Sequence, residues 1–257
     1  MKDYKIYCVY HDPKLIDEYN LKETDNFKLY FTKKENEEKY NLNYAQLYLN
    51  EWIAQYYVWK NNLKSDIVGF CHYRRPLYNY ININDQLMEH IEHSQYYTFE
   101  FGFFPKSNFV KKFYTSGLGY HVELYKKYIK ERYGEFYYDR YIKLLYSPWY
   151  YQTYRELYLC KWDVFNNLSS FIDGYIKYLF KDALNIDEKE LYKYSLEDYK
   201  NLNDYLNNKN WELKDQFNKY HNLEPLNFYF GSPRCIAFMT EFCIGLFFEL
   251  FYSNKNF

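Results

Sequence analysis

The stretch DIVGFCHYRR, residues 66–75, decides the fold of this chain. It begins with an apolar run containing Ile, Val and Phe, which is typical of a buried inner strand. The run ends abruptly in His72, Arg74 and Arg75. In α/β proteins, ligands bind beyond the carboxyl ends of the strands. Because guanidinium groups match phosphate oxygens in geometry and charge, the stretch predicts a strand that delivers a phosphate-binding tip to a cleft.

The residues before this strand predict a helix. From Leu42 to Trp59, apolar side chains recur at three- and four-residue steps, the pattern of a core-facing helix. Lys60 places a cation where the helix ends, which its dipole favours. Glu51 lies among the apolar positions. It either pairs with an arginine or faces the cleft as an acid/base group or a ligand of a sugar hydroxyl, and the two roles are compatible.

Strands and helices alternate along the rest of the chain. This order predicts an α/β protein with one mixed, Rossmann-like sheet flanked by helices and a helical C-terminal third. Residues 106–120 contain two glycines and are expected to form a mobile loop. Residues 185–222 are charged and Asn-rich and predict only helical fragments. Further strands are expected at residues 6–9, 27–31, 97–104 and 154–160, and helices at 82–93, 123–146, 164–183 and 235–252.

Composition narrows the class of protein. The 257 residues carry a formal net charge of −1, so we expect no nucleic-acid partner. The 37 tyrosines accompany abundant Asn, Lys and Ile, a bias that AT-rich codons produce, so their number alone does not indicate sugar binding.

Five single cysteines lie mostly in apolar runs without a CxxC motif, which predicts buried free thiols in a reducing compartment. The first residues begin a strand and lack the apolar core of a signal peptide, so we expect a cytoplasmic protein.

Several common ligand motifs are missing from the sequence. It contains no GxGxxG, no GxxxxGK[ST] and no GxSxG. It also lacks DxD, the acidic pair with which many sugar-nucleotide transferases hold a divalent ion against the diphosphate. The adjacent arginines could neutralise a diphosphate directly. We therefore assign no metal ligand, although Mn²⁺ or Mg²⁺ stays open as a cofactor. His90 and His93 are expected to be a solvated pair rather than metal ligands.

The most apolar segment, residues 235–252, contains Glu241 and Glu249. Such charges are costly in a bilayer centre, so a buried or interfacial helix is favoured over a membrane span. Glu241 is either the partner of a structural ion pair with Arg234 or Arg75, or a catalytic group. Peripheral attachment to the inner face of a membrane stays open through four side chains, Phe247, Phe248, Phe251 and Tyr252.

The sequence resembles a bacterial and viral family of capsular and exopolysaccharide glycosyltransferase-like proteins. Its hallmark, ELTxxYWxWKN followed by DYxGLxHYRRY, is matched by EWIAQYYVWKN at 51–61 and DIVGFCHYRR at 66–75. Looser similarities follow in order along nearly the whole chain. The family's final Glu-Arg pair is Glu241-Phe242 here, so one cation is lost. The looser blocks are IYCVYH at 6–11, Tyr120-His121, ERYGEF at 131–136, LYLCK at 157–161 and RCIAFMTEF at 234–242.

The resemblance implies a GT-A-like fold in one domain over residues 1–257, with a nucleotide-sugar-binding half at 1–105 and an acceptor-side half at 106–257. It implies transfer of a sugar from a UDP-hexose or UDP-galactofuranose donor to a glycan or lipid-linked glycan in surface polysaccharide synthesis. The alternative is a non-catalytic nucleotide-sugar- or glycan-binding protein on the same fold. We expect Glu51 or Glu241 to be the base, His11, Asp66, His72, Arg74 and Arg75 to bind the donor, and His121 and Arg234 to line the acceptor pocket.

Overall fold

The computed structural model describes residues 3–33, 40–79, 82–100, 114–115, 117–146, 153–221 and 234–253. The chain divides into two compact units: residues 1–101 with 153–172, and residues 102–152 with 173–257. Residues 153–172 thus return to the first unit, whereas the sequence placed them in the second half. Most of the expected loop at 106–120 lies outside the described residues.

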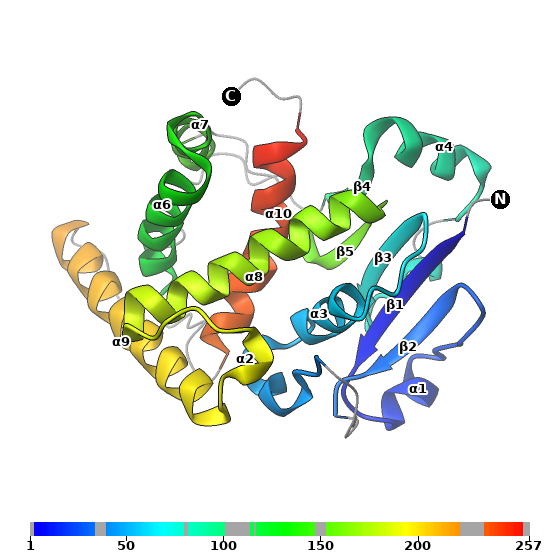
Figure 1. The fold of residues 1–257 in the computed structure, drawn as a ribbon, viewed down its shortest axis with the longest axis horizontal. Coiled ribbons are helices and arrows are strands. Elements are labelled where there is room, and N and C mark those ends of the chain that lie inside the picture. Colours follow the sequence, from blue (N-terminus) through cyan, green and yellow to red (C-terminus); the bar gives the residue numbers. More distant parts are fainter. Residues whose placement is uncertain are drawn as a thin grey trace. The chain divides into compact units, whose positions relative to one another are not determined.

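The first unit is built on a five-stranded mixed sheet (Figure 1). The strands are β1 (Tyr4–Tyr10), β2 (Phe27–Phe31), β3 (Ile67–His72), β4 (Tyr96–Glu100) and β5 (Thr153–Lys161), in the spatial order β2-β1-β3-β5-β4. β1 pairs in parallel with β2 and β3, and β5 pairs antiparallel with β3 and β4. β3 is therefore the central strand, as its continuous apolar run predicted.

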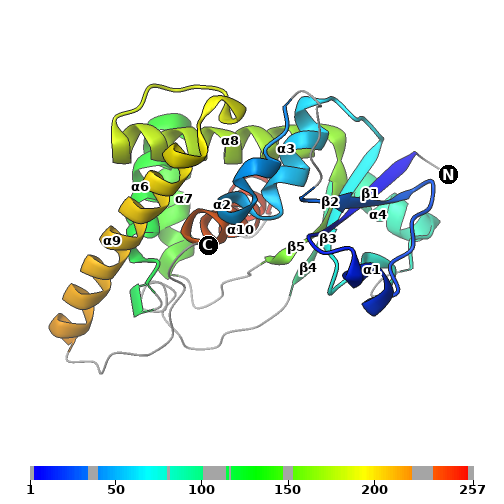
Figure 2. The same cartoon turned by 90° about the horizontal axis from the view of Figure 1, so that it is seen from below.

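Helices cover both faces of this sheet (Figure 2). On one face, α1 (Lys14–Glu18) and α4 (Asp85–Ser94) pack on a core that includes Ile6, Cys8 and Leu159. On the other face, Phe70 stacks on Phe165 at the start of α8 (Trp162–Leu184), with ring centroids 5.3 Å apart. Tyr158 donates a hydrogen bond to Gln55 of α3 (Trp52–Lys60) over 2.8 Å. Because side chains alternate along a strand, His72 shares the face of Phe70 and α3.

The expected helix over residues 42–60 is broken. It forms the short helix η1 (Asn43–Ala45), α2 (Gln46–Leu49) and α3, with an interruption at Asn50. Asn50 has φ 49° and ψ −128°, which no helix can contain. The prediction of one continuous helix was wrong because a regular apolar pattern does not reveal a backbone reversal between two helical segments. A further short helix, η2 (Leu77–Asn79), follows β3.

The second unit is helical. α6 (Gly119–Tyr133) packs against α7 (Glu135–Tyr146) and α9 (Leu196–His221), while α10 (Cys235–Phe251) contacts α7 and α9. Tyr125 of α6 stacks on Tyr175 of α8 at 4.3 Å and donates a hydrogen bond to the Met239 carbonyl in α10. The predicted helix over 123–146 is split at Gly134, whose φ of 85° suits glycine at a helix end.

The 26-residue helix α9 replaces the helical fragments expected for residues 185–222. Beside the apolar Tyr199, Leu202 and Leu206, its buried face carries a polar set at helical spacing: Asn203, Asn207, Asn210, Lys214 and Asn218. Asn203 accepts a hydrogen bond from the Cys235 N–H, and Asn210 accepts one from the Tyr120 N–H. These amides satisfy backbone donors in the first turns of α10 and α6, which have no intrahelical partners. The charged, Asn-rich composition predicted only fragments because part of the buried face of this helix consists of capping amides rather than apolar side chains.

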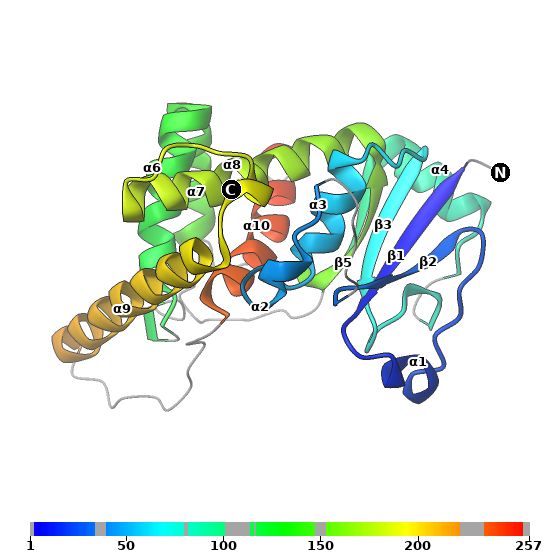
Figure 3. The ribbon, with the colours of Figure 1, turned by 60° about the horizontal axis from the view of Figure 1, so that its bottom comes forward.

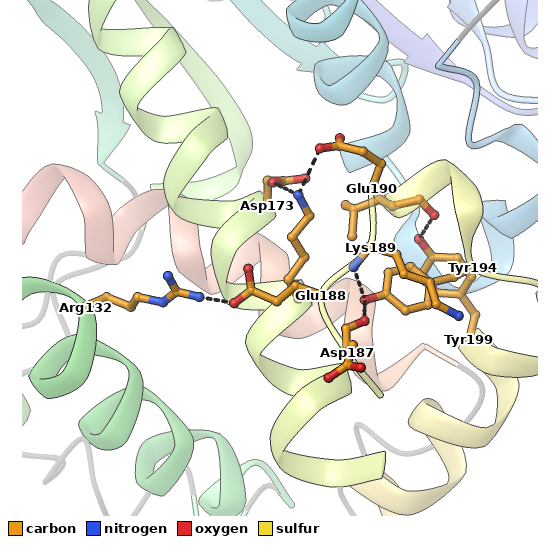
Figure 4. Close-up of polar contacts among 10 residues, drawn as sticks. Arg132, Asp173, Asp187, Glu188, Lys189, Glu190, Tyr194 and Tyr199 are labelled. Atoms are coloured by element: carbon orange, nitrogen blue, oxygen red, sulfur yellow. Dashed lines mark hydrogen bonds and ion pairs between the residues drawn. The ribbon is translucent and has the colours of Figure 1, made fainter. Parts of the chain in front are cut away.

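A polar network holds the segment between α8 and α9 (Figure 4). Lys177 lies 2.8 Å from Asp173 and 3.5 Å from Glu190, and Arg132 pairs with Glu188. The Tyr194 hydroxyl accepts a hydrogen bond from the Lys189 N–H. The short helix η3 (Leu191–Lys193) lies within this segment, so ion pairs and a tyrosine anchor tie the approach to α9 onto α8.

The apolar helix α10 is buried inside the second unit, as one of the two sequence interpretations expected. Phe247 and Phe248 are buried, and Phe251 and Tyr252 are half-buried, so two of the four side chains considered for membrane contact are covered by the fold. In the described part of the chain, every helix is too short or too polar to cross a bilayer.

Candidate functional site

Candidate site residues gather where β1 and β3 end in the first unit. Figure 3 shows α2, and with it the start of α3, on the side of the sheet to which β1 and β3 point. Parallel pairing places Val9 opposite His72, so His11 and residues 73–75 follow two neighbouring strands out of the same edge. The edge predicted from the basic tip of β3 is thus assembled from two strand ends and one helix start.

Glu51 and His72 form the central pair of this edge. Their atoms Oε1 and Nε2 lie 3.3 Å apart, and less than a fifth of either side chain is exposed. The Arg74 backbone N–H donates to Nδ1 of His72 over 3.2 Å. An imidazole nitrogen that accepts a hydrogen bond carries no proton, so Nε2 holds the ring proton and donates it toward Glu51. Glu51 precedes α3 without capping it, which leaves the carboxylate for this contact.

The two arginines occupy the turn after β3. The Arg75 N–H donates to the His72 carbonyl over 2.8 Å, which closes the turn. The Arg74 side chain is exposed, with its guanidinium 5.3 Å from the centre of the Tyr73 ring, whereas Arg75 is half-buried. The turn thus gives the two adjacent arginines different exposure at one edge of the sheet.

Tyr73 is a contributor that the sequence interpretation passed over. Its ring is almost fully buried and meets the rings of His11 and Tyr19 edge-on, each at 5.2 Å. Its N–H donates to the Val9 carbonyl, which continues the pairing of β3 with β1 beyond His72. Tyr73 therefore supports both His11 and Arg74. The sequence feature that could have identified Tyr73 is its position between His72 and Arg74 in HYRR.

The backbone next to Glu51 is strained. A non-glycine residue with the positive φ of Asn50 occupies a sparsely populated conformation, and such conformations gather at functional sites. Here the reversal turns the chain from α2 into α3 and brings Glu51 to the end of β3. Asn tolerates positive φ better than most residues, which accounts for its presence.

Asp66 lies away from the other candidate donor-binding residues. It precedes β3, at the opposite end of the strand from His72, and its carboxylate accepts a hydrogen bond from the Asp3 N–H over 3.2 Å. A six-residue strand separates the two ends by roughly 20 Å. The structure therefore brings together Glu51, His72, Arg74, Arg75 and His11, but not Asp66.

The remaining candidates belong to the second unit. His121 is fully buried in α6, and its Nε2 lies 3.8 Å from the Cys235 sulfur. Burial lowers the pKa of His121 and raises the pKa of Cys235 to about 12, so the two form a neutral contact rather than an ion pair. Arg234 is exposed just before α10, and Glu241 is half-buried two turns further along that helix.

The cysteines have no catalytic geometry. All five are free and buried, as predicted. A hydrogen bond with Cys71 and burial raise the pKa of Cys8, and burial raises the pKa of Cys243, so these thiols stay protonated and are poor nucleophiles. Within the described ranges, no three His, Cys, Asp or Glu side chains are grouped so that they could hold a metal ion. His90 and His93 are both exposed.

Comparison with known proteins gives one informative likeness. No protein-family model and no curated protein matches the chain. Among solved structures, it is similar to the apo structure of the bifunctional glycosyltransferase WbbM, with a TM-score of 0.52 and 16% sequence identity. The match covers 90% of this chain and 45% of that one, so the chain spans less than half the length of WbbM. At this identity the likeness establishes a shared fold: the mixed α/β arrangement is one that occurs in a glycosyltransferase.

Proposed function

We propose that this protein is a GT-A-like glycosyltransferase that moves a sugar from a nucleoside-diphosphate donor to a glycan or lipid-linked glycan acceptor. The observation that carries the proposal is the Glu51–His72 pair beside Arg74 and Arg75 at the carboxyl edge of the sheet. The fold likeness to a glycosyltransferase supports it. A UDP-hexose or UDP-galactofuranose donor and an acceptor in surface polysaccharide synthesis follow from the family resemblance.

The diphosphate is assigned to the arginines. Arg74 is exposed in the turn after β3, where a bound phosphate could reach its guanidinium. Charge accumulates on the diphosphate as it leaves, so fixed cationic donors at this place favour the transition state over the ground state. We assign His11, which follows β1, to the nucleoside of the donor.

Glu51 is assigned as the general base, for a reaction that inverts the anomeric centre. Its carboxylate takes the proton of the acceptor hydroxyl while that oxygen bonds to the anomeric carbon. The bond between that carbon and the diphosphate oxygen breaks, and the diphosphate leaves with the electron pair. With Nδ1 held by the Arg74 N–H and Nε2 directed at Glu51, His72 acts through Glu51 as a positioning residue.

Turnover tests the proposal most directly. Purified protein is incubated with UDP-glucose, UDP-galactose, UDP-N-acetylglucosamine and UDP-galactofuranose, with and without a lipid-linked glycan extract, and UDP release is measured. We expect release from one donor, stimulated by acceptor. UDP binding by calorimetry without release from any donor would favour the non-catalytic alternative. Absence of both binding and release would overturn the assignment of this edge.

A further inference from the structure

A pocket lies at the opposite edge of the same sheet. An open pocket of about 580 Å³ is lined by residues that include Lys64, Asp66, Lys161, Trp162 and Asp163. We propose that this pocket binds neutral saccharide units of a glycan, separately from the edge that carries Glu51 and His72. The proposal concerns binding alone and does not depend on transferase activity.

The strand pairing explains how the pocket forms. β5 runs antiparallel to β3, so Lys161 at the end of β5 lies opposite Ile67 at the start of β3. α8 begins directly after Lys161, and the Trp162 N–H donates to the Asp66 carbonyl over 3.2 Å. The chain reversal between β5 and α8 thereby brings an indole and several charged side chains to the start of the central strand.

Much of the lining is held in place by the protein itself. The Lys161 ammonium donates to the Glu92 carbonyl over 2.8 Å and lies 3.3 Å from the Glu92 carboxylate. The half-buried indole of Trp162 meets the buried ring of Phe165 edge-on at 5.4 Å. A ligand would therefore find an ordered aromatic wall and ordered polar groups, which reduces the entropy lost on binding.

The charge of the lining selects the class of ligand. Four carboxylates and two ammonium groups line the pocket, a formal balance of −2. This balance disfavours phosphates and acidic sugars, so the pocket is unsuited to the donor diphosphate. Because Lys161 is paired with Glu92, the spermidine measurement described below distinguishes a cationic ligand from a neutral saccharide. A sugar hydroxyl both donates and accepts, so it can use carboxylate acceptors and ammonium donors together.

The indole supplies the apolar contact that a sugar requires. Each pyranose has an apolar C–H face, and an aromatic wall with a few polar groups beside it is the usual lining of a small-molecule site. The end-to-end distance of β3, roughly 20 Å, allows one extended glycan to contact this pocket without occupying the opposite edge.

The test measures binding of maltotriose, chitotriose and lactose by saturation-transfer NMR and by tryptophan fluorescence. We expect at least one of them to bind with a Kd on the order of 1 mM. Trp162→Ala should weaken that binding about tenfold or more, the effect of removing a stacking partner. Trp211→Ala is the matched control, because Trp211 is a half-exposed tryptophan of α9 in the other unit. It should leave binding unchanged.

Asp163→Asn provides a second variant that does not depend on the indole packing, since Asp163 is exposed. It should weaken saccharide binding while UDP affinity stays at the wild-type value, which separates this site from the proposed transfer site. The proposal is overturned if no saccharide binds, or if binding survives both Trp162→Ala and Asp163→Asn. It is also overturned if spermidine binds in the pocket and the saccharides do not.

Discussion

Glu51 and His72 contact each other across 3.3 Å because the chain reverses at Asn50 and brings the start of α3 to the end of β3. The Arg74 N–H fixes which imidazole nitrogen carries the proton, so the pair has a defined direction from His72 to the carboxylate. A carboxylate held in this way is oriented before substrate arrives. This contact supports the assignment of Glu51 as the general base more strongly than its position in the sequence does.

Glu51→Gln should lower turnover about 10²- to 10⁴-fold, the usual contribution of a general base. Its melting temperature should stay close to that of the wild type because the amide can still accept from His72. Glu89→Gln, at an exposed position of α4, is the control and should retain full activity. Glu241→Gln should lower turnover less than Glu51→Gln does. Full activity in Glu51→Gln would move that residue to a structural role.

Arg74→Ala and Arg75→Ala should each weaken UDP binding by about 1.5–3 kcal/mol, the free energy of a hydrogen bond to a charged group. Calorimetry would then report a Kd roughly 10- to 150-fold higher. Lys22→Ala, which removes an exposed cation elsewhere in the first unit, should not change the Kd. If UDP affinity is unchanged in both arginine variants, the diphosphate does not bind at this turn.

EDTA should reduce UDP binding only slightly, since the arginine pair can balance the diphosphate charge without a bridging ion. Calorimetry before and after chelation, followed by addition of Mn²⁺ or Mg²⁺, measures the difference. A loss of binding that either ion restores would show that carboxylates hold a metal against the diphosphate, with Glu51 the first residue to examine.

Protonation of His121 should make the protein less stable in mild acid. Burial lowers the pKa of His121 in the folded state, while the unfolded chain takes up this proton near its ordinary pKa of about 6.5. The unfolded state therefore binds more protons below that pH, and the stabilisation present at higher pH is lost as pH falls. At pH 5.5 the loss from this group is on the order of 1 kcal/mol.

Urea unfolding at pH 7.5 and 5.5 measures this effect. The difference in unfolding free energy between the two pH values should shrink by on the order of 1 kcal/mol in His121→Gln. His93→Gln, at an exposed position of α4, should keep the full difference. Identical pH dependence in His121→Gln and wild type would contradict the prediction.

Gly69→Ala should destabilise the protein by about 1–3 kcal/mol, the range for overpacking a filled core. A Cβ at this position would lie 2.6 Å from Cδ2 of Leu159 and 3.0 Å from the Tyr158 carbonyl oxygen. Urea unfolding of the single and double variants checks the cause. Combining Gly69→Ala with Leu159→Ala should cost less than the sum of the two changes, because the shorter side chain removes part of the clash.

The local pattern of apolar residues was sufficient to predict the strands and helices that bury apolar side chains. The run at 66–75 identified the central strand, and β2, β5, α8 and α10 lie where apolar periodicity placed them. These elements are readable because the period of their apolar residues reports which face is buried. The same residues indicated that a histidine and two arginines leave the sheet at one edge. The buried state of the five free cysteines followed from the apolar runs around them.

Tertiary structure decided what depends on distant residues. Part of the buried face of α9 consists of amides that cap α10 and α6, and no local pattern reveals partners in other helices. The break at Asn50 follows from one backbone conformation, and the contact between Glu51 and His72 depends on that break. Asp66 begins the stretch that contains His72, yet a whole strand lies between them because an extended chain advances about 3.3 Å per residue. Sequence proximity therefore grouped residues that β3 separates, and only the pairing of β3 with β1 and β5 showed which edge each one occupies.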